Sequence, residues 1–487
     1  MGDDLQISGG AGGMTARYED MLGYASVLDG AGDDLRDKSG DLGQLLVDGD
    51  ILQAAVLCPA EVAGVEASIA AAATGPAGAL WTSGELEVTA RFLRTSVDVM
   101  QETDELLAQA QELAFTAGGF LLGAATPAAV LALLGAAASN PALAAYLVAH
   151  KDELLAELQT TLYDNPWLLE ALTRMAPSLL QGGAFSLAAL LPGGPLALML
   201  LTDGNWPTGD YASAIAGLLA LANKGGLLQD TGDFTVDQVK DSTFPVDITE
   251  DNALQTIFEQ QDLVGNQPGQ VQVVRVDHGT DPPSWIVQIP GTQDWSPTRT
   301  DNPVDLTSNV TMMAMPDQTI IEQQVAAAMR AAGIKDGEGV MLTGHSQGGI
   351  TAASMATDPA ILDEFDIKSV VTGGSPIGRF DIDEDISVMS LEHEQDVVPK
   401  LDGTDNPDQP NWTTVTRELS DAEGTNDETG QRGPGEAHSV PNYVGTGADV
   451  DGSDDPGIEQ WREDQEQFFN GTDQTSRTRY QISPEEK

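Results

Sequence analysis

Residues 339–357 read G-V-M-L-T-G-H-S-Q-G-G-I-T-A-A-S-M-A-T, and this stretch decides the fold. Its apolar first part predicts a β-strand, and its Ala-rich second part predicts an α-helix. Between the two parts, Ser346 has Gly344 two residues before it and Gly348 two residues after it. Small residues at these positions let a strand turn sharply into a helix without a steric clash. The stretch therefore predicts a nucleophile elbow, with amide N–H groups of the helix N-terminus available to an oxyanion.

Strands and helices alternate around this stretch. Strands are predicted at 271–276, 284–291, 339–344, 369–374 and 386–394, and helices at 317–334 and 347–357. The first two strands flank the turn signal D-H-G-T-D-P-P and are expected to pair with each other. The alternation predicts an α/β fold with a mostly parallel sheet that is covered on both faces.

An all-α domain is predicted to precede the sheet. Apolar residues recur at three- and four-residue spacing in 17–46, 60–73 and 79–113, which is typical of amphipathic helices that form antiparallel hairpins of a small bundle. The predicted domains are a helical bundle at 1–115, apolar helices rich in Ala, Gly and Leu at 116–205, a linker at 206–245, the α/β domain at 246–450 and an acidic C-terminal tail, disordered in part, at 451–487.

Two stretches, 113–149 and 175–202, carry no formal charge. Pro and Gly interrupt both, so the uninterrupted apolar pieces are shorter than the roughly 20 residues that a membrane-spanning helix needs. No excess of Lys and Arg flanks them to set an orientation. Buried helices are therefore favoured, and a membrane hairpin is the alternative.

The charge of the chain excludes one class of partner. The 487 residues contain 76 Asp and Glu against 22 Lys and Arg, a formal net charge of -54, and this charge excludes nucleic acid as a partner.

The single cysteine, Cys58, cannot form an intramolecular disulfide and is expected to be a buried small side chain. No metal-ligand spacing and no phosphate-binding loop is present, so we expect no metal and no cofactor. The first residues lack a secretory signal, which leaves cytoplasmic residence and signal-independent export open.

A serine nucleophile needs a base and an acid that orients this base. Only His393 and His438 follow Ser346. His438 is favoured as the base because it lies in a loop after all the predicted strands, as expected for the chain order serine, acid, histidine. Asp396, just beyond the strand at 386–394, is the predicted acid. The alternatives to Asp396 are Glu392 and Glu394.

The predicted oxyanion hole consists of the N–H groups of Thr292 and Gln347. Gly291 permits a turn after the strand at 284–291, and Thr292 also offers its hydroxyl. His345, although adjacent to the serine, is expected to point elsewhere. The connection at 294–316 is interpreted as a lid or acyl-binding wall, with ordinary helix packing as the alternative. Its candidate residues are Trp295, Met312, Met313 and Met315.

Four motifs occur in order: I-P-G-T at 289–292, G-H-S-Q-G-G at 344–349, T-G-G-S-P-I-G at 372–378 and D-V-V-P at 396–399. With them, residues of about 270 to 445 resemble the class 3 (fungal-type) lipase family. This resemblance implies an α/β-hydrolase fold and activity on lipid or other carboxylic esters, with Ser346, Asp396 and His438 as the triad. Gln347 replaces the family's Leu, and no Arg precedes Gly291, which leaves substrate preference open.

The helices around Trp81 resemble in part the helical-hairpin proteins that type VII secretion systems of actinobacteria export. The turn is Trp-Thr-Ser-Gly in place of Trp-x-Gly, and no tyrosine export signal follows. This resemblance implies a secreted enzyme whose helical half is a delivery module with a secretion-system partner. A membrane contact through the apolar helices of this half is left open. A non-catalytic scaffold with a relic hydrolase fold is a further alternative.

Overall fold

The computed structural model divides into two compact units: Met14–Gln111, and Met1–Gly13 together with Glu112–Lys487. The structure describes residues 5–10, 14–75, 77–98, 100–101, 115–116, 120, 122, 151–188, 194–205, 210–298, 300–314, 319–426, 429–472 and 474–485. The domain limits predicted at 205, 245 and 450 do not separate units, because the segments on either side of them belong to the same unit.

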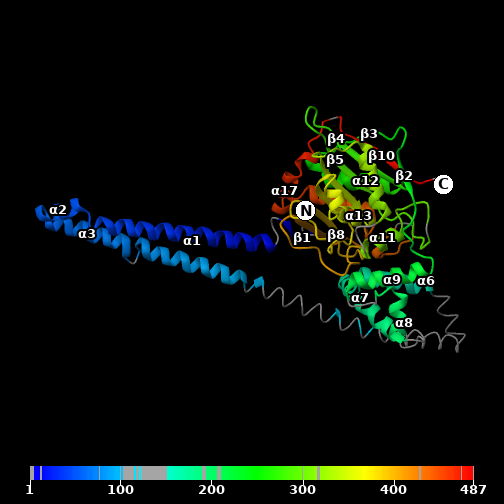
Figure 1. Ribbon diagram of the computed structural model, residues 1–487, viewed down its shortest axis with the longest axis horizontal. Helices are drawn as coiled ribbons and strands as arrows, with labels where there is room; N and C mark the ends of the chain where they lie inside the picture. The colour runs from blue at the N-terminus through cyan, green and yellow to red at the C-terminus, as the bar shows by residue number, and fades with distance from the viewer. Residues whose placement is uncertain are drawn as a thin grey trace. The chain divides into compact units, whose positions relative to one another are not determined.

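The unit Met14–Gln111 is helical throughout its described elements: α1 (Met14–Leu45), α2 (Gly49–Leu57), α3 (Pro59–Thr74) and a further helix over 79–98. Helix α1 packs along α3 (Figure 1). Two ion pairs, Arg36 with Glu87 and Arg94 with Asp29, connect α1 to the helix over 79–98.

Cys58 lies between α2 and α3 and is exposed. The prediction that it is buried was wrong. The side chain stands at a junction of two helices, and its Sγ contacts only the Ala54 carbonyl of the preceding turn, at 3.3 Å, among the hydrogen bonds of the described residues.

The other unit contains a mixed α/β fold built on a ten-stranded sheet (Figure 1). The strand order is β1-β9-β8-β7-β6-β5-β4-β10-β2, and β3 pairs with β10. The strands are β1 (Leu5–Gly9), β2 (Phe234–Gln238), β3 (Phe244–Pro245), β4 (Gln270–Val276), β5 (Ser284–Ile289), β6 (Gly339–His345), β7 (Asp366–Gly373), β8 (Ser387–His393), β9 (Trp412–Arg417) and β10 (Ser476–Pro484). Strands β5 to β9 are parallel, and the strands outside them pair antiparallel.

Alternate side chains of the central strands enter two separate cores. Val340 and Leu342 of β6 pack into the core that contains α12 (Ile320–Ala332) and α13 (Gln347–Met355), whereas Met341 packs into the core that contains α10 (Ala253–Gly265) and α16 (Val440–Asp451). This alternation follows from the two-residue period of a strand. Helices therefore cover both faces of the sheet, as predicted. The other described helices that follow β2 are α11 (Leu306–Ala314), α14 (Pro359–Leu362), α15 (Pro434–Ala437) and α17 (Pro456–Asp464), with the short 3-10 helices Glu250–Asn252 and Glu466–Phe468.

Of the helices whose bounds the structure describes in this unit, those that precede β2 are α6 (Lys151–Tyr163), α7 (Pro166–Ala188), α8 (Gly194–Leu201) and α9 (Tyr211–Lys224). Three of them contact the loops that follow β9, β8 and β7. Tyr163 of α6 donates to the Ser420 carbonyl at 2.9 Å, Arg174 of α7 pairs with Asp405 at 2.5 Å, and the Tyr211 ring of α9 lies under the Arg379 guanidinium at 4.8 Å. These helices therefore lie at the carboxyl end of the parallel strands, which is the edge where ligands bind in α/β sheets.

The two uncharged stretches have different outcomes. The stretch at 113–149 lies, apart from four residues, outside the described part of the chain. In the stretch at 175–202, α8 is mostly exposed, with Leu196 and Leu200 exposed by 65% and 70%, so the prediction of burial was wrong for this helix. Among the described residues, no helix combines the length and the hydropathy of a membrane span.

The C-terminal segment is part of the sheet, and the prediction of a tail at 451–487 was wrong. Strand β10 lies between β4 and β2, and its Tyr480 and Ile482 are buried in the core. The linker predicted at 206–245 contains α9, β2 and β3. The segment was predicted as a tail because many acidic residues precede β10. The strand itself, S-R-T-R-Y-Q-I-S-P, contains no acidic residue.

We predict that Ile482→Ala lowers the free energy of unfolding by about 2–5 kcal/mol, because it removes a buried side chain from the core. Ser483→Ala, one residue further on the opposite face of β10, is the matched control and should change it by less than about 0.5 kcal/mol. Urea unfolding of the full chain measures both. Equal stability of the two variants would show that this segment does not pack in the core.

Candidate active site

Ser346 is the single residue between β6 and α13. Its backbone dihedral angles are φ 56° and ψ −123°, a conformation that non-glycine residues rarely adopt. The Ser346 N–H donates to the Gly373 carbonyl at the end of β7, at 3.0 Å. The structure thus places this serine on a strained strand-to-helix turn at the carboxyl end of the central strands.

Gly344 and Gly348 leave no room for a side chain. A Cβ atom on Gly344 would lie 2.0 Å from the carbonyl carbon of Gly348, and one on Gly348 would lie 2.0 Å from the carbonyl oxygen of Ile289. Each contact is with the main chain, which cannot move aside as a flexible side chain would. The turn around Ser346 therefore requires glycine on both sides.

Asp396 and His438 form a hydrogen-bonded pair in which the acid is buried and the histidine is partly exposed. The His438 Nδ1 donates to the Asp396 Oδ2 at 2.7 Å, and the Asp396 side chain is completely buried. Asp396 lies in the turn after β8, and His438 directly follows the short helix α15. Forty-two residues separate them in the chain, and the fold brings them together.

Two further donors hold the Asp396 carboxylate. The Tyr443 hydroxyl donates to Oδ2 at 2.7 Å, and the Val398 N–H donates to Oδ1 at 2.8 Å. Burial alone would raise the pKa of Asp396, but the charge of His438 and these hydrogen bonds outweigh it, so the pKa stays below its ordinary value. The acid is therefore ionised at neutral pH, and it fixes the proton of His438 on Nδ1.

Ser346 and His438 line one cavity of about 280 Å³. No hydrogen bond joins these two side chains, both of which lie in the described part of the chain. Contacts between nucleophile and base are often loose before a substrate binds. The other residues that line the cavity are Gln261, Asp262, Gly265, Asn266, Gly291, Thr292, Trp295, His345, Ser439 and Val440.

The predicted oxyanion donors lie next to the serine. Thr292 lines the cavity after β5, and Gln347 is the first residue of α13. The Asn309 amide donates to the Thr292 Oγ1 at 2.6 Å, so the Thr292 hydroxyl keeps its own hydrogen to donate. Among the hydrogen bonds of the described residues, neither the Thr292 N–H nor the Gln347 N–H has an acceptor.

The side-chain amide of Gln347 is buried and makes no hydrogen bond to the described residues. The residue is 1% exposed, and neither its Nε2 nor its Oε1 has a hydrogen-bond partner among the described residues. A buried amide in this state is less stable than an apolar side chain of similar size. Gln347 therefore lowers stability at this position relative to an apolar side chain of similar size.

Glu392 and Glu394, the alternative acids, bind other partners. Glu392 accepts a hydrogen bond from the Asn406 amide at 2.6 Å, and Glu394 accepts one from the Gln6 amide at 2.8 Å. His438 makes its carboxylate contact with Asp396 alone among the described residues. The position just beyond the strand thus selected the residue that contacts the histidine.

The connection at 294–316 only partly matches its predicted role. Trp295 lines the cavity and is 66% exposed, as a residue of a cavity rim would be. Met312 is buried in the core beside α13, and Met313 accepts a contact from the Tyr211 hydroxyl at 3.6 Å. Both contacts are ordinary packing. Met315 lies outside the described residues.

Sequence reasoning missed three residues around the pair. His345 lines the cavity, and its Nε2 donates to the His438 carbonyl at 2.9 Å, so the expectation that it points elsewhere was wrong. His393 and Tyr443 stack with ring centroids 3.9 Å apart beside Asp396. Nothing in the sequence indicates that Tyr443, five residues after His438, contacts Asp396, because the contact depends on how α16 packs on the sheet. His278 contacts Ser284, and His150 lies outside the described residues.

Among the described residues, no group of three or more His, Cys, Asp or Glu side chains is arranged to hold a metal ion. Comparison with protein-family models, with curated proteins and with solved structures finds no match to this chain. The function is therefore inferred from the site and not from a relative.

We predict that Gly348→Ala destabilises the chain by about 1–3 kcal/mol, because the methyl group would overlap the Ile289 carbonyl. Gly435→Ala is the control: Gly435 lies in α15, and a Cβ there meets nothing within 4 Å. Thermal unfolding of both variants measures the difference. If Gly348→Ala unfolded at the same temperature as Gly435→Ala, the close approach of β5 and α13 would be wrong.

Proposed function

We propose that this chain is a serine hydrolase of the α/β-hydrolase type that cleaves carboxylic esters through an acyl-enzyme. The observation that carries the proposal is the hydrogen bond of 2.7 Å between the buried Asp396 and His438, which lines the same cavity as the strained Ser346. The Ser346 side chain is the nucleophile in this proposal. Because His438 donates through Nδ1, its Nε2 is the nitrogen left to accept a proton.

In the first half of the reaction, His438 Nε2 takes the Ser346 proton while Oγ attacks the acyl carbon. The carbonyl oxygen becomes an oxyanion, to which the Thr292 and Gln347 N–H groups donate. The C–O bond to the alcohol breaks, and the alcohol leaves with the proton from His438. In the second half, a water molecule gives a proton to His438 and attacks the acyl-enzyme. The acid leaves, and the proton returns to Ser346.

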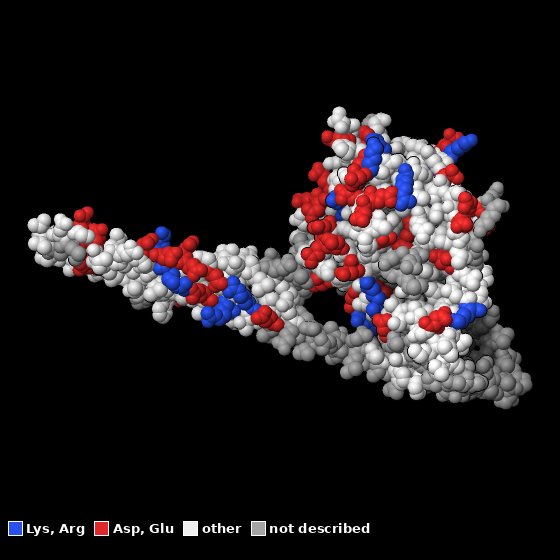
Figure 2. Space-filling model, viewed as in Figure 1, with Lys and Arg blue, Asp and Glu red and all other residues white. Residues whose placement is uncertain are grey.

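Charge and cavity size favour a small neutral ester as the substrate. Acidic side chains outnumber basic ones over the face of the sheet unit seen in Figure 2, in a chain of formal net charge -54. An anionic substrate is repelled by such a field. A cavity of about 280 Å³ is at the small end of ligand sites, which suits a short acyl chain.

We predict that a fluorophosphonate probe labels the wild-type chain and that Ser346→Ala abolishes this labelling, because the probe reacts only with an activated serine. Asp396→Asn should keep the fold and lower the rate of ester hydrolysis by roughly 10⁴-fold. Ser439→Ala is the matched control. Ser439 lines the same cavity but does not lie on the strained turn, so this variant should be labelled like the wild type. Labelling of Ser346→Ala at the wild-type rate would rule out the proposed nucleophile.

We predict that kcat/KM for 4-nitrophenyl butyrate exceeds that for the anionic 4-nitrophenyl hemisuccinate, which has the same leaving group. The difference should shrink when NaCl is raised to 1 M, because screening shortens the reach of the protein's charge from about 10 Å to about 3 Å. 4-Nitrophenyl palmitate, in the same series, should be a poorer substrate than the butyrate. Equal values for the neutral and the anionic ester at both salt concentrations would contradict the electrostatic argument.

A further inference from the structure

Three consecutive carbonyl groups lie at the end of helix α15 (Pro434–Ala437), and the last of them is that of His438, the residue that caps the helix. They belong to Glu436, Ala437 and His438. The last carbonyls of a helix find no N–H donor within the helix, and donors from outside it can satisfy them. That of Glu436 already accepts from the Ser439 N–H at 3.0 Å. Here each of the three accepts a hydrogen bond from a different side chain, and the three side chains come from three different elements: β8, β6 and α16.

His393, the last residue of β8, holds the middle carbonyl. Its Nδ1 donates to the Ala437 carbonyl at 2.8 Å, and its Nε2 faces the Thr446 hydroxyl of α16 at 2.8 Å. Burial lowers the pKa of His393 to about 4, so the ring is neutral and carries one N–H. Because a carbonyl can only accept, this N–H is on Nδ1. The Tyr443 ring stacks on His393 at 3.9 Å and fixes its plane.

His345, the last residue of β6, holds the third carbonyl. Its Nε2 donates to the carbonyl oxygen of His438 at 2.9 Å, and its ring lies against the His438 imidazole with centroids 4.4 Å apart. Burial holds the pKa of His345 well below its ordinary value, so this ring is neutral as well. The neighbour of Ser346 in the chain thus contacts both the main chain and the side chain of the proposed base.

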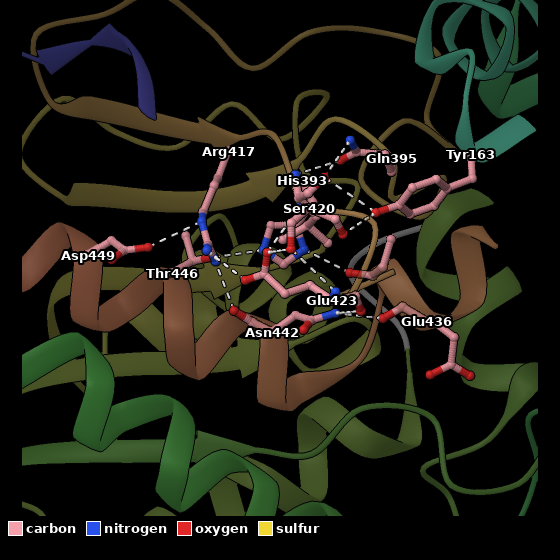
Figure 3. A network of polar contacts seen from close by, with 12 residues as sticks. Tyr163, His393, Gln395, Arg417, Ser420, Glu423, Glu436, Asn442, Thr446 and Asp449 are labelled. Carbon is pink, nitrogen blue, oxygen red and sulfur yellow. Dashed lines mark hydrogen bonds and ion pairs between the residues drawn. The ribbon is translucent and has the colours of Figure 1, made fainter. Parts of the chain in front are cut away.

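Asn442 of α16 holds the first carbonyl and connects it to the loop after β9. Its Nδ2 donates to the Glu436 carbonyl at 2.9 Å and to the Glu423 carbonyl at 3.1 Å. The Glu423 carboxylate pairs with Arg417 at 2.6 Å, and Arg417 also donates to Thr446 at 3.2 Å. Figure 3 shows how this network surrounds His393 and reaches Asn442.

We propose that His345, His393 and Asn442 are positioning residues that clamp the loop of the catalytic histidine, so that the imidazole of His438 is directed at Ser346. The proposal rests on the proposed function, since it assigns these residues to the same site. Asp396 fixes the ring of His438 through its side chain, and the clamp fixes its main chain. Both are needed, because a displacement of about 1 Å between reacting groups lowers a rate by roughly 100-fold.

The test uses the full chain and pairs a removal variant with a conservative one at each histidine. His345→Leu and His393→Leu remove the donors. His393→Asn restores a donor near the Nδ1 position, and His345→Gln restores one near the Nε2 position. The removal variants should lower kcat for 4-nitrophenyl butyrate by about 10–100-fold with KM changed less than about threefold, and the conservative variants should recover most of the loss. Asn442→Leu should behave as a third removal variant.

A second measurement does not depend on activity. Hydrogen exchange followed by mass spectrometry reports on the amides of residues 433–440, which should exchange faster in the removal variants than in the wild type and slowly again in the conservative ones. His278→Leu is the matched control, because His278 contacts Ser284 at the opposite end of β5 from Thr292. It should leave both the rate and the exchange of 433–440 unchanged.

The outcomes separate the clamp from the proposed function. Unchanged exchange and unchanged kcat in His345→Leu and His393→Leu would overturn the clamp, and so would a loss of kcat that Asn and Gln do not recover. A wild-type chain that hydrolyses no ester and takes no fluorophosphonate label would overturn the proposed function, whatever the exchange of 433–440 shows.

Discussion

The close approach of strand β6 and helix α13 around Ser346 is the constraint on which the rest of the site depends. A methyl group on Gly344 of β6 would lie 2.0 Å from the carbonyl carbon of Gly348 in α13, so these two elements can meet in this way only through glycine. A methyl group on Gly348 would lie 2.0 Å from the Ile289 carbonyl oxygen of β5, so α13 and β5 need glycine as well. The approach imposes a φ of 56° on Ser346 and leaves the first N–H of α13 free beside it. The turn thus fixes the position of Ser346. The packing of other elements places Asp396 and His438 near it.

The part of the fold that follows from local pattern could be predicted, and the part that follows from distant pairing could not. Strands β4 to β8 and helices α12 and α13 were confirmed, because apolar runs between turn signals mark them in the sequence. Strand β10 was missed because acid-rich residues precede it in the chain and because its neighbours in the sheet, β4 and β2, lie more than two hundred residues earlier, so no local turn signal marks their pairing. Strand β1 was missed for the same reason, since its partner is β9.

The same distinction holds for the site. The order of Ser346, Asp396 and His438 along the chain was enough to expect the last two as partners, and the structure brings them to 2.7 Å. No sequence signal assigns the residues around them. Tyr443 reaches Asp396 only because α16 packs against α10, and His345 reaches the His438 carbonyl only because the end of α15 lies beside the end of β6. Contacts that depend on the packing of two elements are not contained in either element's own sequence.

The backbone conformation of Ser346 lowers the stability of the folded chain, whereas Asp396 is held ionised in a fully buried site, and both features agree better with the proposed enzyme than with a relic scaffold. The backbone conformation of Ser346 costs of order 1–3 kcal/mol in a residue that has a Cβ atom. Burial raises the pKa of Asp305 and Asp402 to about 6, but Asp396, although completely buried, is kept ionised by the charge of His438 and by three aimed hydrogen bonds. A scaffold gains nothing from a strained serine or from an ionised acid out of contact with water. Acyl transfer uses both, because the first presents the nucleophile and the second stabilises the imidazolium that forms when the base takes its proton.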